Sequence, residues 1–290
     1  MRHIMPLMRH SVEPGPGVSI SSLAYDYPPA CVVPEHAHAS DQLIYATRGV
    51  MEVTVMQSFW LIPPQFALWI PAQTRHKIRM PSAVYMRTLY LRPGTADKMP
   101  NHCVVIQVTP LLQELIVETV RLGRLRSRAA LHSALKVVIV ANLHTAMTVP
   151  MRLAIPEDRR GAAVAAAAMA DPVNNRSFKA LCDNAGASTR TIERIFQRQV
   201  GTSFETWRRQ ARLMKAIELL VAGYSVKETA YQVGYRQTGA FVTMFRQTFG
   251  KTPKVWISRL ANTCHEPSAR RRRARSIKMR RIASAARPKN

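Results

Sequence analysis

The sequence predicts a multidomain α+β protein with an antiparallel β-barrel at the N-terminus, a helical segment in the middle and an all-helical domain at the C-terminus. The chain has 290 residues, which exceeds the usual size of one domain. Between about residues 23 and 93, short apolar segments rich in aromatic and β-branched residues are broken by Pro and Gly. After Pro110 the apolar residues are spaced three and four apart, which is typical of amphipathic helices. We place the boundaries so that the predicted units are residues 1–107, 108–170, 171–262 and a tail, 263–290.

The barrel segments follow one another closely, as in a small antiparallel barrel or sandwich. They are residues 42–47, 50–55, 59–63, 67–71 and 85–91. In the next unit, an amphipathic stretch begins at Pro110 and a second helix is predicted from Ala129 to Ala146. Helices in such a position commonly carry dimer contacts, so we expect a homodimer. Residues 149–171 contain two prolines and then an alanine-rich run, which predicts a linker that merges into a helix.

The net charge of +25 and the isoelectric point near 11.1 indicate a polyanionic partner, of which nucleic acid is the leading candidate. Residues 171–260 carry +9, residues 261–290 carry another +9, and the first 170 residues carry +7. The Arg-rich stretch 270–290 has almost no acidic or aromatic residues, so we predict that it is disordered. It either contacts phosphates or is a solvated extension.

Several classes of protein are excluded by what the chain lacks. The four cysteines are far apart and form no CxxC pair, which argues against a zinc finger or a disulfide scaffold. Residues 1–10 lack the apolar core of a signal peptide, and the longest apolar stretch, 135–147, is too short to span a bilayer. We therefore expect a cytoplasmic protein that does not interact with a membrane.

The first half of the C-terminal domain has the pattern of a helix-turn-helix. A short helix is predicted from Ser177 to Asn184, Gly186 supplies the turn, and Ser188 is a good N-cap for a second helix running to about Val200. The second helix of such a unit presents its outward face to the major groove of DNA, where Arg pairs with guanine and Gln with adenine. The outward residues here are Arg190, Thr191, Glu193, Arg194 and Gln197.

The second half repeats this plan about 45 residues later. Ser225 and Glu228 have the spacing of a capping box, Gly234 makes the turn, and Thr238 is predicted to cap a second recognition helix. The candidates for the DNA side of this unit are Arg236, Thr238, Gly239, Thr243 and Arg246. One long helix, 204–221, would hold both units in fixed register. A helical bundle with a merely solvated basic face would not explain two glycine-turn units with matching caps.

These residues closely resemble the signature of the AraC/XylS family of transcription regulators. The second unit carries it in Gly234, Tyr235, Phe241, Phe245, Arg246, Gly250, Thr252, Pro253 and Trp256. The first unit carries it in Ser188, Arg190, Ile192, Arg194, Phe196 and Gly201. The resemblance implies that both recognition helices enter successive major grooves of double-stranded DNA. It further implies an N-terminal domain that senses a small-molecule effector, a dimer, and contact with RNA polymerase if the protein is an activator.

The chain departs from the family after Gly234 and Tyr235. The usual acidic residue and two serines are replaced by Arg236, Gln237 and Gly239. Glycine near a helix start costs about 1 kcal/mol relative to alanine and offers no side chain for reading bases. Our hypothesis is that the first unit reads the sequence while the second grips phosphates through Arg236 and Arg246.

The barrel region contains a histidine pattern that resembles the two motifs of cupin barrels. His36, His38 and Gln42 match the first motif, and His76 matches the second. Alternate residues of a strand point to the same side, so His36 and His38 are expected to converge on a centre that His76 reaches from a neighbouring strand. Three imidazoles suit a divalent metal such as zinc, nickel or iron, but Gln42 stands where metal-binding cupins have an anionic Glu.

Two interpretations of the histidines stay open: they bind a metal, or they line a polar pocket and bond within the barrel. An enzyme, namely a cupin metalloenzyme with an appended DNA-binding module, would need an intact metal centre, and Gln42 argues against it. A sequence-neutral architectural DNA-binding protein would not need two registered modules. The sequence therefore favours a non-enzymatic, sequence-specific transcription regulator.

Overall fold

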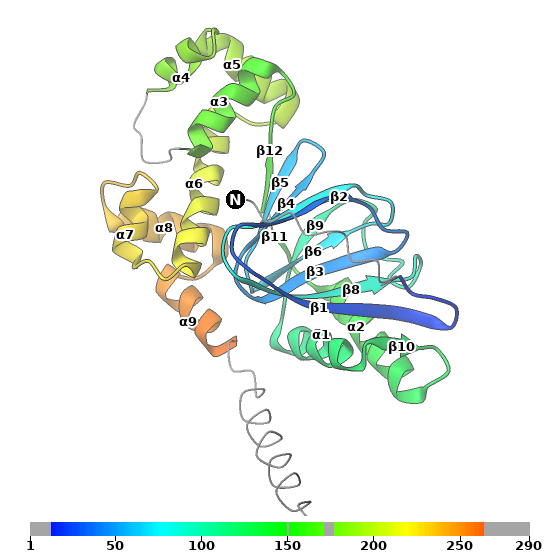
Figure 1. Cartoon of the computed structure of the whole chain (residues 1–290). Coiled ribbons are helices and arrows are strands. Elements are labelled where there is room, and N and C mark those ends of the chain that lie inside the picture. Colours follow the sequence, from blue (N-terminus) through cyan, green and yellow to red (C-terminus); the bar gives the residue numbers. More distant parts are fainter. Residues whose placement is uncertain (1–12, 150, 171–176, 264–290) are drawn as a thin grey trace, which may run out of the picture.

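The computed structural model describes residues 13–149, 151–170 and 177–263 (Figure 1). The N-terminal half consists of two antiparallel sheets, as predicted from the sequence. The seven-stranded sheet contains, in spatial order, β10 (Arg124–Arg126), β1 (Val18–Tyr27), β8 (Val84–Leu91), β3 (Asp41–Arg48), β6 (Phe66–Ile70), β9 (Val104–Gln107) and β11 (Thr148–Val149). The five-stranded sheet contains β12 (Arg152–Ala154), β5 (Ser58–Ile62), β4 (Met51–Val55), β7 (His76–Met80) and β2 (Cys31–His36).

Side chains alternate across these strands, which fixes the register of the sheets. In β7, for example, His76, Ile78 and Met80 are buried, whereas Lys77 and Arg79 are exposed. A shift by one residue would turn the whole apolar set toward water. The period-two pattern therefore determines which face of each strand lines the core.

The turn between β3 and β4 depends on a glycine. Gly49 has φ of +83°, and a Cβ at this position would lie 2.1 Å from the carbonyl oxygen of Ala83. A side chain here would meet both left-handed backbone strain and a backbone clash. The close approach of this turn to residue 83 thus requires glycine.

Helices α1 (Pro110–Leu122) and α2 (Ala130–Thr145) cover one face of the seven-stranded sheet (Figure 1). Thr109 caps α1 by accepting a hydrogen bond from the N–H of Leu112, as the proline at the first helical position favours. Leu112 and Ile116 of α1 and Ile139 of α2 share a buried cluster with residues of β1, β3 and β8. Helix α2 is apolar on more than one face, and part of it stays exposed.

The predicted linker contains structure that the sequence pattern did not indicate. Its two short strands, β11 and β12, each extend one sheet before the helix α3 (Arg159–Ala170) begins. In β12, Arg152 pairs with Trp60 of β5 and Ala154 with Ser58. The helix predicted at the end of this segment is present as α3, but the part before it forms an edge strand of each sheet, which the sequence pattern did not indicate.

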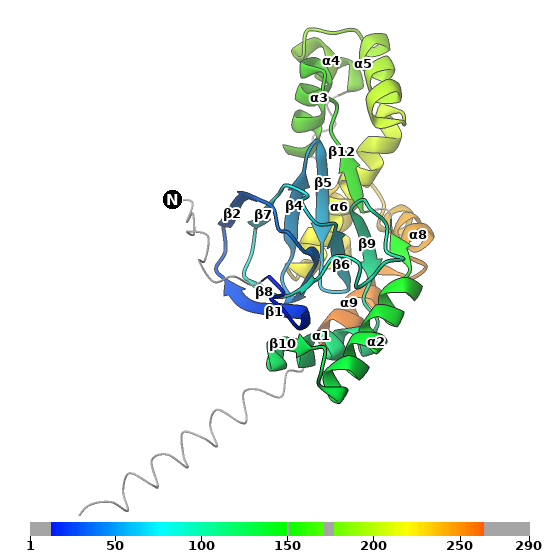
Figure 2. The ribbon, with the colours of Figure 1, turned by 90° about the vertical axis from the view of Figure 1, so that its right-hand side faces the viewer.

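The C-terminal half is helical, with two helix-turn-helix units joined by one long helix. The elements are α4 (Phe178–Asn184), α5 (Thr189–Ile195), a π-helical turn (Phe196–Val200), α6 (Phe204–Val221), α7 (Val226–Gln232), α8 (Thr238–Phe249) and α9 (Pro253–Thr263). In both views α3, α4 and α5 lie beyond one end of the barrel, while α1 and α2 lie toward the other end (Figure 2).

The predicted caps are largely present. The side chains of Ser188 and Ser225 each accept a backbone N–H in the first turn of the following helix, and Glu228 completes the capping box of α7. Ser177, predicted as the first residue of its helix, is instead the N-cap of α4 and accepts the N–H of Ala180. The prediction for α8 is wrong. Thr238 is its first residue, and the N-cap is Gln237, whose side chain makes no capping bond. Helix α8 starts without the usual side-chain acceptor for its free N–H groups.

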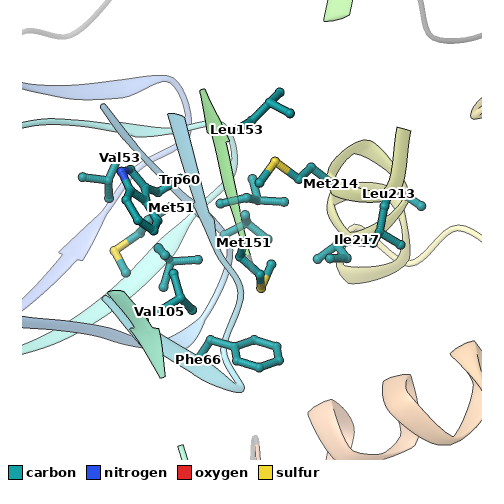
Figure 3. Packing of buried hydrophobic residues seen from close by; sticks show 14 of the residues in the cluster. Met51, Val53, Trp60, Phe66, Val105, Met151, Leu153, Leu213, Met214 and Ile217 are labelled. Atoms are coloured by element: carbon teal, nitrogen blue, oxygen red, sulfur yellow. The ribbon is translucent and has the colours of Figure 1, made fainter. Parts of the chain in front are cut away.

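The barrel and the helical half pack against each other along α6. Figure 3 shows Met151 and Leu153, from the linker, facing Met214 and Ile217 of α6. The Trp207 indole N–H donates to the carbonyl oxygen of Ala154 at 2.7 Å. At the far end of the contact, the Gln65 amide donates to the carbonyl oxygen of Trp256 at 2.8 Å. Apolar burial and hydrogen bonds together fix this contact.

An ion pair between Glu52 and Arg79 lies in the five-stranded sheet. Glu52 of β4 is almost fully buried and accepts hydrogen bonds from Arg79 of β7, its partner in the strand register. Burial raises the pKa of Glu52, while Arg79 acts in the opposite direction. The charges of Glu218 and Lys215 on α6 act on this pKa in opposite directions, Glu218 raising it and Lys215 lowering it.

Candidate functional site

Three histidines meet at one edge of the five-stranded sheet. His36 ends β2 and His76 begins β7, and the two are partners in the strand register. His38 lies just beyond the end of β2, so it reaches the cluster from a loop. The expectation that His36 and His38 lie on one strand is therefore wrong, but the predicted convergence is confirmed. One ring nitrogen from each of the three lies within 4.8 Å of the other two.

The surroundings of the rings leave one nitrogen of each available. His36 Nδ1 lies 2.8 Å from the carbonyl oxygen of Pro34, and His76 Nδ1 lies 2.9 Å from that of Thr74. A carbonyl oxygen only accepts, so Nδ1 of each ring carries the proton and Nε2 keeps its lone pair. In His38 the Nδ1 atom is 3.4 Å from a carboxylate oxygen of Glu13. These are the outer partners that orient metal-binding imidazoles.

Two of the Nε2 atoms in this cluster are buried and lack a hydrogen-bond partner in the described part of the chain. Among the described residues, His38 Nε2 and His76 Nε2 have no hydrogen-bond partner. Buried polar atoms nearly always find one, so such atoms are expected where a ligand binds. Burial also lowers the pKa of His76 to about 4 and lowers the pKa of His38, with the neighbouring His36 acting in the same direction. Both rings are therefore neutral at pH 7, which is the form that binds metals.

Gln42 lies on β3, in the opposite sheet, and connects to the cluster through Tyr90. Its amide donates to the hydroxyl of Thr88 at 3.3 Å, while its own oxygen is buried with no partner in the described part of the chain. Tyr90, its register partner on β8, packs edge-on against His38 with ring centroids 4.9 Å apart. Gln42 thus has a neutral side chain at the motif position where metal-binding cupins have a charged Glu.

The first helix-turn-helix unit presents part of its predicted reading face to solvent. Arg190, Arg194 and Gln197 are exposed, whereas Ile192 and Ile195 are buried on the opposite side of α5. The other two predicted residues are already engaged within the unit. The Glu193 carboxylate accepts the backbone N–H of Phe204 at 3.2 Å, and the Thr191 hydroxyl lies 2.9 Å from that of Ser188. Of the five, the two arginines and Gln197 are the ones that extend freely outward.

In the second unit the predicted residues lie on the outer face of α8 and just before it. Phe241 and Phe245 are buried, as predicted, with their rings 5.8 Å apart. The exposed residues are Arg236, Gly239, Thr243 and Arg246, and Thr238 is half-buried. The two units therefore differ: the first exposes two arginines on its helix, and the second exposes one arginine before the helix and one near its end.

Two family models match the chain in the two halves that the structure separates. Residues 21–135 match the AraC-like ligand binding domain, and residues 181–259 match a helix-turn-helix domain. The chain belongs to the AraC family of transcription regulators. It is a DNA-binding regulator with an N-terminal ligand-binding domain. No helix in the described ranges is long and apolar enough to cross a membrane.

Individual relatives of this AraC-family regulator agree with this assignment. The chain is 29 % identical over 227 residues to the HTH-type transcriptional regulator NimR of Escherichia coli, covering 78 % of this chain and 83 % of that protein. It is 31 % identical over 104 residues to the HTH-type transcriptional regulator RipA of Corynebacterium glutamicum, covering 36 % and 31 %. Among solved structures it is similar to ToxT from Vibrio cholerae, with 11 % identity, a TM-score of 0.35 and coverage of 82 % and 98 %. The two family models and the regulators NimR and RipA give the alternative of a cupin metalloenzyme no support.

Sequence reasoning missed Arg152 and the way in which the barrel meets the helical half. Arg152 and Trp60 are adjacent across β12 and β5 and border a cavity. Neither residue belongs to a motif, and Arg152 lies in a segment whose strand character is weak. The contact arises from tertiary packing rather than from a local pattern.

Proposed function

We propose that this regulator senses a divalent transition metal through His36, His38 and His76, and that metal occupancy controls its binding to specific DNA sequences in the cytoplasm. The observation that carries the proposal is the set of three inward nitrogens, two of them buried without partners. Lone pairs brought this close repel one another unless a cation lies between them. A bound metal would remove that repulsion and accept all three.

The chemistry of the donors favours zinc or nickel over calcium or magnesium. Imidazole nitrogen is a good ligand for zinc and nickel, whereas calcium and magnesium prefer oxygen ligands. Gln42 would add at most a neutral oxygen, so none of the candidate ligands carries a negative charge to strengthen binding, and the nearest carboxylate, that of Glu13, contacts only His38 Nδ1 among the ring nitrogens. Such a site is suited to reversible sensing. It is less suited to permanent retention of a structural ion.

Titration of the metal-free, full-length protein with Zn²⁺ and Ni²⁺ tests the proposal. The wild type should bind one ion per chain, and His76→Gln should weaken binding by about 100-fold or more, because it removes one of three ligands. His102→Gln, which changes an exposed histidine outside the cluster, is the matched control. Unchanged affinity in the His76 variant, or DNA binding that is the same with and without metal, would refute the proposal.

We further propose that the two units divide the work of binding DNA. Arg194→Ala should relax the sequence preference by about 1–3 kcal/mol at one base pair, because an arginine that pairs with guanine is lost. Arg246→Ala should instead weaken binding to every sequence and reduce its salt dependence. The measurement is affinity for an operator and for a scrambled duplex at several salt concentrations, with Arg124→Ala on the distant β10 as control. If both variants lose sequence preference equally, the proposed difference in role between the two helix-turn-helix units is wrong.

The exposed face of α2 supports a homodimer. Leu131, Ala134, Val138 and Ala141 are exposed at spacings of three and four, while Ile139 and Leu143 are buried on the other side. This is the seam of a short coiled coil, and a second copy of α2 is a suitable cover. We expect Val138→Glu to shift the protein to monomers in sedimentation experiments, and Lys136→Glu, off the seam, to leave the dimer intact. A wild type that sediments as a monomer at micromolar concentration would contradict this expectation.

A further inference from the structure

The recognition helix of the first helix-turn-helix unit changes its geometry before it ends. Helix α5 continues into the π-helical turn Phe196–Val200. At the end of this turn the N–H of Gly201 donates to the carbonyl oxygen of Phe196, five residues back, at 3.0 Å. In the second unit the N–H of Gly250 donates to the carbonyl oxygen of Arg246, only four residues back. The first recognition helix therefore ends in a wider turn than the second.

The wider turn helps to keep residues four positions apart in line. In an α-helix of 3.6 residues per turn, such residues drift around the axis by about 40°. A π-helical turn contains more residues, which reduces this drift. On the core side, Ile192, Phe196 and Val200 follow one another at this spacing. The first two are fully buried and the third is half-buried against the same apolar cluster.

On the outer side the same spacing lines up three arginines. Arg190, Arg194 and Arg198 are all exposed. None of them forms an ion pair with a residue in the ranges 13–149, 151–170 and 177–263. Gln197 is also exposed, but it precedes Arg198 by one position and so lies to one side of this line. Arg198, which belongs to no sequence motif, therefore extends the row of positive charge on the outer face of the helix.

Arg198 lies about one groove width from the start of the recognition helix. It follows Arg190 by eight positions, which at 1.5 Å per residue span about 12 Å along the axis. The major groove of B-DNA is also about 12 Å wide. The first residues of a recognition helix contact the edges of the bases. A side chain one groove width further along the helix is therefore expected close to the phosphate chain that borders the groove.

We propose that Arg198 is a further DNA-contacting residue, whose guanidinium binds a backbone phosphate at the edge of the major groove that α5 enters. A guanidinium can donate to two oxygens of one phosphate, which fixes the position of a helix as well as adding attraction. Arg198 would thus anchor the end of the helix whose earlier residues, Arg190 and Arg194, reach the bases. The proposal depends on DNA binding by the first unit. It requires neither a bound metal nor a difference in role between the two units.

The salt dependence of DNA binding tests this contact in the full-length protein. The probes are a labelled duplex of scrambled sequence and a duplex obtained by in vitro selection. Arg198→Gln should reduce the slope of log K against log salt by about 0.9 and weaken binding to both duplexes about fivefold at about 0.15 M salt. The ratio of the two affinities should stay within about twofold of the wild-type ratio. An unchanged slope would overturn the proposal, and a larger fall in the ratio would assign Arg198 to a base and overturn it equally.

Two further variants separate the position of the charge from the charge itself. Arg124→Gln on β10 removes an exposed arginine of the barrel and should leave the slope unchanged. Gln197→Arg combined with Arg198→Gln keeps the net charge but moves the arginine off the line of Arg190 and Arg194, so most of the loss should remain. Recovery of the wild-type slope by this double variant would refute the proposed geometry. Circular dichroism and thermal unfolding confirm that each variant is folded.

Discussion

Trp207→Ala should lower the free energy of unfolding of the helical half by about 3–5 kcal/mol, since it empties the centre of a closely packed aromatic cluster. Trp207 is 1 % exposed, and its ring lies 5.4 Å from that of Phe196 and 6.0 Å from that of Phe204. Its indole N–H also bonds to Ala154 in the linker strand. The substitution therefore removes core packing and a bond between the two halves together. Urea unfolding followed by far-UV circular dichroism measures the loss.

Trp207→Phe separates the two contributions. It keeps much of the ring packing but leaves the partly buried carbonyl oxygen of Ala154 without its donor, which should cost about 0.5–1.5 kcal/mol. Tyr231→Ala removes an aromatic side chain that is 49 % exposed on α7, and should change stability by no more than about 0.5 kcal/mol. A loss below about 1 kcal/mol for Trp207→Ala would show that this cluster does not stabilise the domain.

The helical half could be predicted closely because its signals are local. Serine caps, glycine stops and residues spaced three and four apart each act within one or two turns, and Ser188 and Ser225 both cap where the pattern places them. The exception, Thr238, shows the limit of this reasoning. A threonine that follows a turn is a common N-cap residue. In this chain, however, α8 begins one residue earlier than predicted, so Gln237 occupies the N-cap position.

The contacts between distant segments could not be predicted. Arg152–Ala154 is too short to show an alternating pattern, and it forms a strand because the open edge of β5 offers it unpaired backbone groups. Similarly, Glu193 lies on the predicted reading face, yet its carboxylate bonds to the start of α6 because the chain folds back after Gly201. The histidines were found because their spacing resembles the two motifs of cupin barrels. Their tautomers depend on Pro34 and Thr74, which no motif indicates.

The metal-free protein should lose stability as the pH falls from about 6.5 to about 4, and His76 should account for much of the loss. Its pKa is lowered by burial from 6.5 to about 4 in the folded state. Above pH 6.5 the ring is neutral in both the folded and the unfolded chain, so it has no effect. Below that pH the unfolded chain takes up a proton that the folded chain resists, which favours unfolding by about 3 kcal/mol by pH 4.

His76→Gln isolates this effect, because glutamine is polar but does not titrate. The difference in unfolding free energy between wild type and variant should change by about 3 kcal/mol over this pH range, whereas His102→Gln should show the same pH dependence as the wild type. Protons and a metal would compete for the same Nε2 atom, so Zn²⁺ should stabilise the wild type more at pH 7 than at pH 5. Parallel curves for wild type and His76→Gln would mean that His76 is not held neutral by burial. The ring would then be protonated before any metal could reach it in mildly acidic solution, and the three nitrogens would be a hydrogen-bonding cluster rather than a sensor.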